Sequence, residues 1–378
     1  MKLEAALDER LRRAMFSPSQ WARLASLAQV RVVDPRQLGA GQGPEQTADT
    51  EVLITGWGCP PLTPTVLDAR PRLALIVHTG GSTRAFIGPD VFERGIQVCS
   101  QTARNAEPVA EFCLAQILLA AKHVPQATRR YADTRTLGTF DEIYPWADPT
   151  AGRETGTLGP ETPDSRPRDR AWGSKRGAGA GGSPVRAPET AREFGVFGTT
   201  VGLIGYGQVC RRLVELLRPF SVRILLASPY LDEDTARTLG VELVSPAAVM
   251  STADVISIHL GATPDNHGAI TADLLRLIKP GATFINTARG IVVDEPALIG
   301  ELRTGRFDAV LDVTWPEQPA ADSPLWTLPN VTLTPHWAGS LGRELFYLGE
   351  GAVDNVEQYI AGRPLTGLIA PTLAPYLA

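Results

Sequence analysis

The chain has 378 residues, of which 43% are apolar and 20% are charged, and its formal net charge is −5. This length exceeds what one ordinary hydrophobic core accommodates, so the sequence predicts two domains. A mildly acidic chain lacks the basic surface that attracts nucleic acid or an anionic membrane, so we expect neither as a partner.

Three further features narrow the class of protein. Residues 1–16 contain several acids and no uninterrupted apolar run, unlike a signal peptide. The most apolar helical stretch, 109–121, is short and contains Glu111 and Gln116, so it cannot span a bilayer. The four cysteines are scattered without a CxxC pair, which argues against a metal site or a disulfide. We therefore expect a cytoplasmic protein that holds no metal.

The first hundred residues alternate short apolar runs with helical patterns. Residues 52–56, 73–81 and 96–100 are typical of buried strands that end in turns. A strongly apolar helix is expected next, starting at Asn105 as its N-cap with Pro108 in the first turn. Apolar residues surround nearly the whole helix, so it belongs to a core or to a dimer surface.

Residues 149–188 differ in kind from the rest of the chain. They are rich in glycine and proline, and their only large apolar side chains are Leu158, Trp172 and Val185. Such a segment buries too little surface to offset the entropy of ordering it. The sequence therefore predicts a disordered insertion here that carries no chemistry.

A regular series of strands follows the insertion. The strands are expected at 200–204, 223–228, 254–260, 282–287, 309–313 and 331–335, with helical patterns between them. This alternation predicts an α/β fold with a doubly wound parallel sheet. Ligands bind such sheets beyond the carboxyl ends of the strands, so the residues that follow each strand are the candidates for function.

The first of these strands leads into the stretch "GYGQVC", which has the form of a dinucleotide-binding turn. Gly205 opens the turn, and Gly207 lets the backbone approach a pyrophosphate. The helix that begins near Gln208 and Val209 offers its N–H groups to the phosphates. Cys210 stands where a third glycine is usual, a position that serves helix–strand packing, so the phosphate-facing part is intact. The alternative is an ordinary strand–helix turn.

The next strand ends at Ser228, where an acid usually binds both hydroxyls of the adenosine ribose. Serine can bond a hydroxyl or tolerate a 2′-phosphate. However, no arginine follows closely, and the nearby Asp232, Glu233 and Asp234 repel a phosphate. The sequence therefore favours NAD, with NADP left open.

Three ionisable residues follow the later strands: Arg289, Glu317 and His336. Histidine can move the proton that accompanies hydride transfer at an alcohol carbon, and a carboxylate beside it can orient the imidazole. Arginine supplies the planar donor that anchors a substrate carboxylate. Taken singly, such a histidine is more often structural and such charges are more often solvated. Their succession at strand ends favours catalysis.

The stretches "VGLIGYGQV", "LIKPGATFINTARGIVVDEPAL", "LDVTWPEQP" and "NVTLTPHWAG" resemble the D-isomer-specific 2-hydroxyacid dehydrogenases. "LALIVHTGGS" and "ERGIQVCSQTARNAEPVAE" extend the resemblance toward the N-terminus, so that it covers most of the chain apart from 124–195. It implies Arg289 as substrate anchor, Glu317 as partner of the histidine and His336 as acid/base. It also implies a set of binding residues: Gly80, Gly81 and Ser82 for the substrate carboxylate, and His259, Thr287, Ala288 and Asp312 beside the nicotinamide.

The resemblance further implies a Rossmann NAD(P)-binding domain inserted into a flavodoxin-like substrate domain. The substrate domain would comprise 1–102 and 342–378, the cofactor domain 103–341, and the protein would be a homodimer. The expected activity is NAD(P)-dependent interconversion of a small D-2-hydroxy acid and its 2-keto acid. The alternative is a non-enzymatic NAD(H)-sensing protein, like the corepressors that share this fold.

Overall fold

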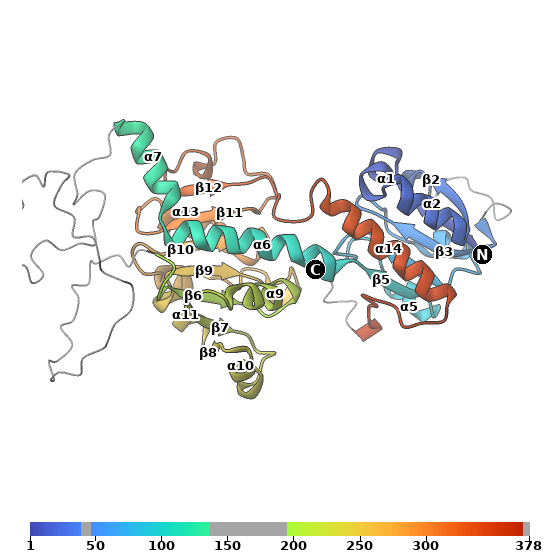
Figure 1. Ribbon diagram of the computed structural model, residues 1–378. Coiled ribbons are helices and arrows are strands. Elements are labelled where there is room, and N and C mark those ends of the chain that lie inside the picture. Colours follow the sequence, from blue (N-terminus) through green and yellow to red (C-terminus); the bar gives the residue numbers. More distant parts are fainter. Residues whose placement is uncertain (39–46, 136–194, 373–378) are drawn as a thin grey trace, which may run out of the picture. The chain divides into compact units, whose positions relative to one another are not determined.

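The computed structural model describes residues 1–38, 47–135 and 195–372 (Figure 1). Residues 1–124 and 195–378 form one compact unit, and residues 125–194 form a second. The described part of the second unit is nearly all helix, belonging to α7 (Val124–Thr134). The insertion predicted at 149–188 lies outside the described residues. Within the described ranges, no helix is long and apolar enough to cross a membrane.

The N-terminal part of the first unit contains a five-stranded parallel sheet with the order β2-β1-β3-β4-β5. Its strands are β1 (Lys2–Ala6), β2 (Gln29–Val33), β3 (Thr50–Thr55), β4 (Leu75–His78) and β5 (Gln97–Ser100). This order is the flavodoxin-like arrangement, in which helices cover both faces.

Alternate side chains of these strands face two separate cores. Leu3 and Ala5 of β1 belong to one core with residues of helices α1, α2 and α14, whereas Ala6 belongs to the other. The helices around this sheet are α1 (Glu9–Met15), α2 (Pro18–Leu27), α4 (Pro64–Asp68), α5 (Pro89–Glu93) and α14 (Glu344–Ile360). Through α14, the last described helix of the chain completes the core of its first sheet.

The second sheet has seven parallel strands in the order β12-β11-β10-β9-β6-β7-β8. They are β6 (Thr200–Ile204), β7 (Arg223–Ala227), β8 (Glu242–Leu243), β9 (Val255–Ile258), β10 (Thr283–Asn286), β11 (Asp308–Leu311) and β12 (Val331–Leu333). The strand order reverses between β6 and β9. This is the topology of a dinucleotide-binding Rossmann fold, whose ligand crevice lies at that reversal.

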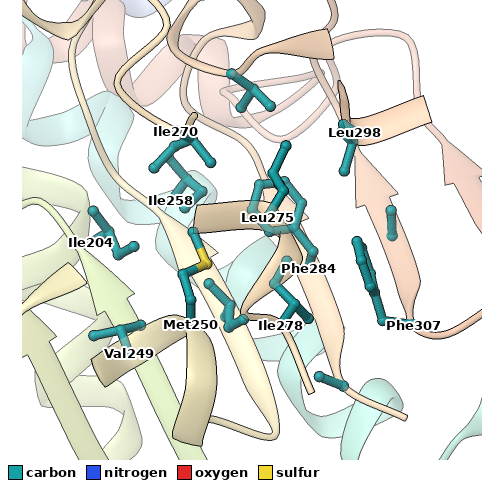
Figure 2. Close-up of a cluster of buried hydrophobic side chains, with 14 of the residues drawn as sticks. Ile204, Val249, Met250, Ile258, Ile270, Leu275, Ile278, Phe284, Leu298 and Phe307 are labelled. Carbon is teal, nitrogen blue, oxygen red and sulfur yellow. The ribbon is translucent and has the colours of Figure 1, made fainter. Parts of the chain in front are cut away.

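Helices cover both faces of this sheet. They are α6 (Thr102–Ala121), α9 (Gln208–Leu217), α10 (Glu233–Leu239), α11 (Pro246–Thr252), α12 (Ala272–Arg276) and α13 (Glu295–Leu302). On one face α6 and α9 pack together, and α6 lies across β9 and β10 (Figure 1). On the other face, Met250, Leu275 and Leu298 from α11, α12 and α13 surround Phe284 of β10 (Figure 2). The predicted fold class, two doubly wound parallel-sheet domains, is confirmed.

Some local predictions were wrong. The strand β1 was missed because "KLEAA" lacks the β-branched residues that mark strands, although its position between β2 and β3 buries it. The apolar helix begins at Thr102 rather than after Asn105, with Pro108 inside it. The Asn105 side chain does not cap the helix; its Oδ1 accepts a hydrogen bond from Ser340 N at 3.1 Å.

Glu4 of β1 is a fully buried carboxylate surrounded by donors. Its Oε2 accepts a hydrogen bond from Arg70 Nε at 2.9 Å, and its Oε1 accepts one from Thr50 Oγ1 at 2.8 Å. Arg31 also pairs with Glu4. Arg70 is itself buried and donates to the Val66 carbonyl at 2.9 Å. The first sheet therefore encloses a buried ion pair, and removing either charge would destabilise the fold.

We expect Glu4→Gln to destabilise the protein by about 3 kcal/mol, because the neutral amide removes a buried carboxylate that is paired with both Arg70 and Arg31. Urea unfolding followed by circular dichroism measures the loss. Glu9→Gln is the matched control, since Glu9 pairs with Arg12 and Arg13 on an exposed helix face and should change stability little. Equal unfolding midpoints for the two variants would contradict the assignment.

Candidate active site

The turn after β6 has the geometry of a phosphate-binding loop. Gly205 has a φ of 98°, and a Cβ at this position would lie 2.5 Å from the His259 carbonyl oxygen, so only glycine fits. Gly207 is the N-cap of α9, and no side chain caps the helix there. The space beside Gly207 is open. The first N–H groups of α9 are thus free to bind an anion, which fits the pyrophosphate of a dinucleotide.

Cys210 serves packing in this structure. Its side chain is fully buried in a core with Cys113 and Val109 of α6 and Leu203 of β6. Burial raises the pKa of the Cys210 thiol to about 12. The thiol is therefore neutral and fills the contact between α9 and its neighbours, leaving the phosphate-facing backbone unaltered.

A cleft of about 670 Å³ runs from the start of α9 to the ends of β9, β10 and β11. It brings together twelve of the predicted site residues: Gly81, Ser82, Gly207, Gln208, Val209, His259, Thr287, Ala288, Arg289, Asp312, Glu317 and His336. Three predicted residues do not line it: Gly80, Gly205 and Ser228. Gly205 shapes the turn instead, and Gly80 lies against His78 and Trp57. Ser228 follows β7, half-buried, and accepts a hydrogen bond from Tyr230 N at 3.2 Å.

An imidazole and a carboxylate are paired in the cleft. His336 Nδ1 and Glu317 Oε1 are 2.5 Å apart. His336 has a left-handed backbone with a φ of 57°, which is uncommon for a residue with a side chain. Its own N–H donates to the carbonyls of Asp312 and Thr334, both at 3.0 Å. The surrounding loop thus holds His336 in this conformation.

The side chain of Asp312 holds the loop that contains His336 through hydrogen bonds. Its Oδ1 accepts hydrogen bonds from Thr334 Oγ1 at 2.5 Å and from Trp337 N at 2.7 Å, and its Oδ2 accepts one from Ala338 N at 2.9 Å. The carboxylate is buried, with three donors around it. Asp312 lines the cleft as predicted, and it also positions the backbone on both sides of His336.

Arg289 follows β10, and its placement depends on the next residue. A Cβ on Gly290 would lie 2.0 Å from the Thr314 backbone, so the chain carrying Arg289 approaches the chain leading to Glu317 as closely as glycine allows. Arg289 Nη1 donates to the Ala288 carbonyl at 2.7 Å. Burial lowers the pKa of Arg289 and the nearby Glu317 opposes this shift. A guanidinium stays charged in proteins, so the cleft contains a fixed cation.

The sequence reasoning missed two supporting residues. Asn105 lines the cleft and accepts a hydrogen bond from Ser340 N. The sequence assigned Asn105 as an N-cap because the helix was expected to start there, so this contact was not predicted. Glu295 accepts a hydrogen bond from Trp315 N at 2.8 Å and so secures the loop that leads to Glu317. Glu295 lies in the first turn of a helix, where acidic residues are common, so the sequence did not mark it as a functional residue. Within the described residues no cluster of three or more His, Cys, Asp or Glu could hold a metal ion.

His259 is an unusual group in the cleft. Its Nε2 is shielded from solvent and has no hydrogen-bond partner among the described residues. Burial lowers the pKa of His259 from 6.5 to about 4, so the ring is neutral at physiological pH. An unpaired polar atom at the crevice of a Rossmann sheet is positioned to bond a ligand there.

The cleft thus combines a phosphate-binding turn with an imidazole–carboxylate pair and a guanidinium. Residues 173–338 match the sequence model for the D-isomer specific 2-hydroxyacid dehydrogenase, NAD binding domain. These residues of the chain are therefore similar to that family, and the resemblance of its motifs is confirmed. The NAD-binding domain of the family is therefore present.

The chain is also similar to known proteins outside this domain. D-3-phosphoglycerate dehydrogenase of Mycobacterium tuberculosis (strain ATCC 25618 / H37Rv) is 27% identical over 320 residues, which cover 82% of this chain and 51% of that protein. The chain thus spans about half the length of the curated relatives it matches. A phosphoglycerate oxidoreductase from Rhizobium etli (TM-score 0.71, 22% identity, 98% of each chain) shares the fold. So does D-mandelate dehydrogenase from Rhodotorula graminis (TM-score 0.72, 18% identity, 98% of this chain and 97% of that one).

The low pKa of His259 predicts a specific loss of stability in acid. The unfolded chain takes up this proton near pH 6.5, whereas the folded protein takes it up only near pH 4. The stability contributed by neutral His259 is therefore fully present above about pH 6.5, and it is lost as the pH is lowered toward 4. We expect His259→Gln to lose less stability over this interval, measured as the unfolding temperature at successive pH values. Parallel curves for the two proteins would refute the assignment.

Proposed function

We propose that this protein is an NAD(P)-dependent oxidoreductase that interconverts a small D-2-hydroxy acid and its 2-keto acid. The observation that carries the proposal is the single cleft in which Arg289, Glu317 and His336 lie together with the start of α9. No one of these residues is specific, but hydride transfer at a hydroxy acid requires all three functions at one place: a phosphate cradle, a carboxylate anchor and a proton donor.

The cofactor would be held largely by backbone. The N–H groups around Gly207, Gln208 and Val209 face the pyrophosphate, while His259, Thr287, Ala288 and Asp312 border the nicotinamide half of the cleft. The bound nicotinamide supplies or accepts the hydride. NAD is the expected cofactor. NADP remains open because Ser228 stands in place of the usual acid and carries no charge to repel a 2′-phosphate.

The substrate carboxylate is assigned to Arg289 and to the loop that contains Gly81 and Ser82. A guanidinium offers two parallel donors to a carboxylate, and the loop adds backbone N–H groups. This arrangement fixes the orientation of the C2 oxygen relative to His336. Positioning of this kind accounts for a large share of the rate in such reactions.

His336 is assigned as the acid/base. Its Nδ1 is engaged by Glu317, which leaves Nε2 to exchange a proton with the substrate oxygen. In the reducing direction His336 protonates the oxygen, and in the oxidising direction it takes that proton. Glu317 orients the ring, the role that a carboxylate has in a catalytic triad. We further propose a homodimer, and we retain domain boundaries of 1–102 with 342–378 and 103–341.

His336→Gln should lower kcat by about 10²–10⁴-fold while NADH affinity changes little, because the variant removes proton transfer and leaves the phosphate cradle intact. Turnover of glyoxylate, hydroxypyruvate and phenylpyruvate is followed by nicotinamide absorbance, with NADH and NADPH in parallel. NADH binding is measured separately by fluorescence. Asp322→Asn is the control, since it removes an exposed carboxylate that does not line the cleft.

Two results would count against the proposal. Equal loss of turnover and of NADH affinity in His336→Gln would show that the histidine supports the fold rather than the chemistry. NADH binding without oxidation across the whole panel of keto acids would favour the non-enzymatic NAD(H)-sensing alternative.

A further inference from the structure

A second cavity, of about 540 Å³, adjoins the active-site cleft. The two share Arg289 and Glu317 in their linings, so these two side chains stand at the boundary between them. The second cavity is also lined by Arg84, His267 and Trp315. None of these three residues has a role in the proposed reaction.

The charges in this cavity are unbalanced. Arg84 and Arg289 contribute two guanidinium groups, and the only carboxylate among the described lining residues is Glu317. That carboxylate is already bonded to His336. The lining therefore has an excess of positive charge beside the site where a keto acid would be held.

The guanidinium of Arg84 lies at the wall of this cavity, where it can bind an anion. Arg84 follows β4, directly after the Gly80–Ser82 loop, and its side chain is exposed. Its Nη1 donates to the carbonyl of Ala262, which places the guanidinium at the cavity wall. Among the described residues no acidic side chain pairs with Arg84. The contact with Ala262 orients the group and leaves other N–H donors to meet a ligand.

We propose that Arg84, with His267 in the lining of the same cavity, forms a subsite for a second anionic group, so that the preferred substrate is a 2-keto acid that extends from Arg289 into this cavity and carries an anion at its far end. The proposal rests on the proposed function, because the first carboxylate must be bound at Arg289. A carboxylate and a phosphate share the chemistry that a guanidinium recognises. Either group would be drawn into the cavity, whereas a substrate with an uncharged tail gains nothing from it.

The test compares 2-keto acids that do or do not carry an anion at the far end. Oxaloacetate is paired with 2-oxobutyrate to test a far carboxylate, and phosphohydroxypyruvate with hydroxypyruvate to test a far phosphate. For each pair the ratio of kcat/KM, dianion over monoanion, is measured in the wild type and in Arg84→Gln and Arg84→Lys. Glutamine and lysine both keep an N–H donor for Ala262, but only lysine keeps the charge.

We expect the wild type to prefer the dianion in at least one pair. In that pair Arg84→Gln should lower the ratio about tenfold, mainly through KM, as expected when a charged contact is removed. Arg84→Lys should restore most of it. Arg94→Gln is the matched control: Arg94 is an exposed arginine paired with Asp68 outside the cavity, and its loss should leave the ratio unchanged.

An unchanged ratio in Arg84→Gln for both pairs would overturn the subsite, and so would an equal fall in Arg84→Lys, because lysine keeps the charge. Failure of the proposed function gives a different result: the wild type reduces no keto acid of either charge. The two failures are therefore distinguishable in one set of measurements.

Discussion

The site depends on one buried carboxylate. Asp312, at the end of β11, accepts three hydrogen bonds from the segment 334–338, and these bonds hold His336 in a backbone conformation that residues with side chains seldom adopt. The segment follows β12 and has no regular secondary structure of its own. The backbone bonds from His336 N to the carbonyls of Asp312 and Thr334 add to this anchoring. The position of the His336–Glu317 pair is thus set in part by hydrogen bonds to the residue that follows β11.

Elsewhere in the cleft, a close approach of two backbone segments positions the charged groups. Gly290 brings the strand end of β10 against Thr314, so that the guanidinium of Arg289 and the carboxylate of Glu317 come from segments in direct contact. Glu295 ties the same loop through Trp315. The charged groups thus lie on the segments that follow parallel strands, where ligands bind in doubly wound sheets.

The sequence was sufficient for the fold class and for most of the cleft, because buried parallel strands and a glycine turn leave strong local signals. Other features left none. The strand β1 resembles a helix in composition, and only its place between two other strands makes it extended. The supporting contacts of Asp312, Asn105 and Glu295 join residues far apart in the chain, and a single sequence contains no record of such pairings. Arg84 is similar: it gains its significance from a cavity that two distant segments enclose.

The packing of Cys210 has a consequence for experiments on the whole molecule. All four cysteines, Cys59, Cys99, Cys113 and Cys210, are buried, and burial raises each thiol pKa to between about 11 and about 12. Thiolate is the reactive form, so the native protein offers almost no target to alkylating reagents or mild oxidants. Two of these thiols report on the first sheet and two on the Rossmann core. The rate at which each becomes labelled therefore measures how often its own core opens.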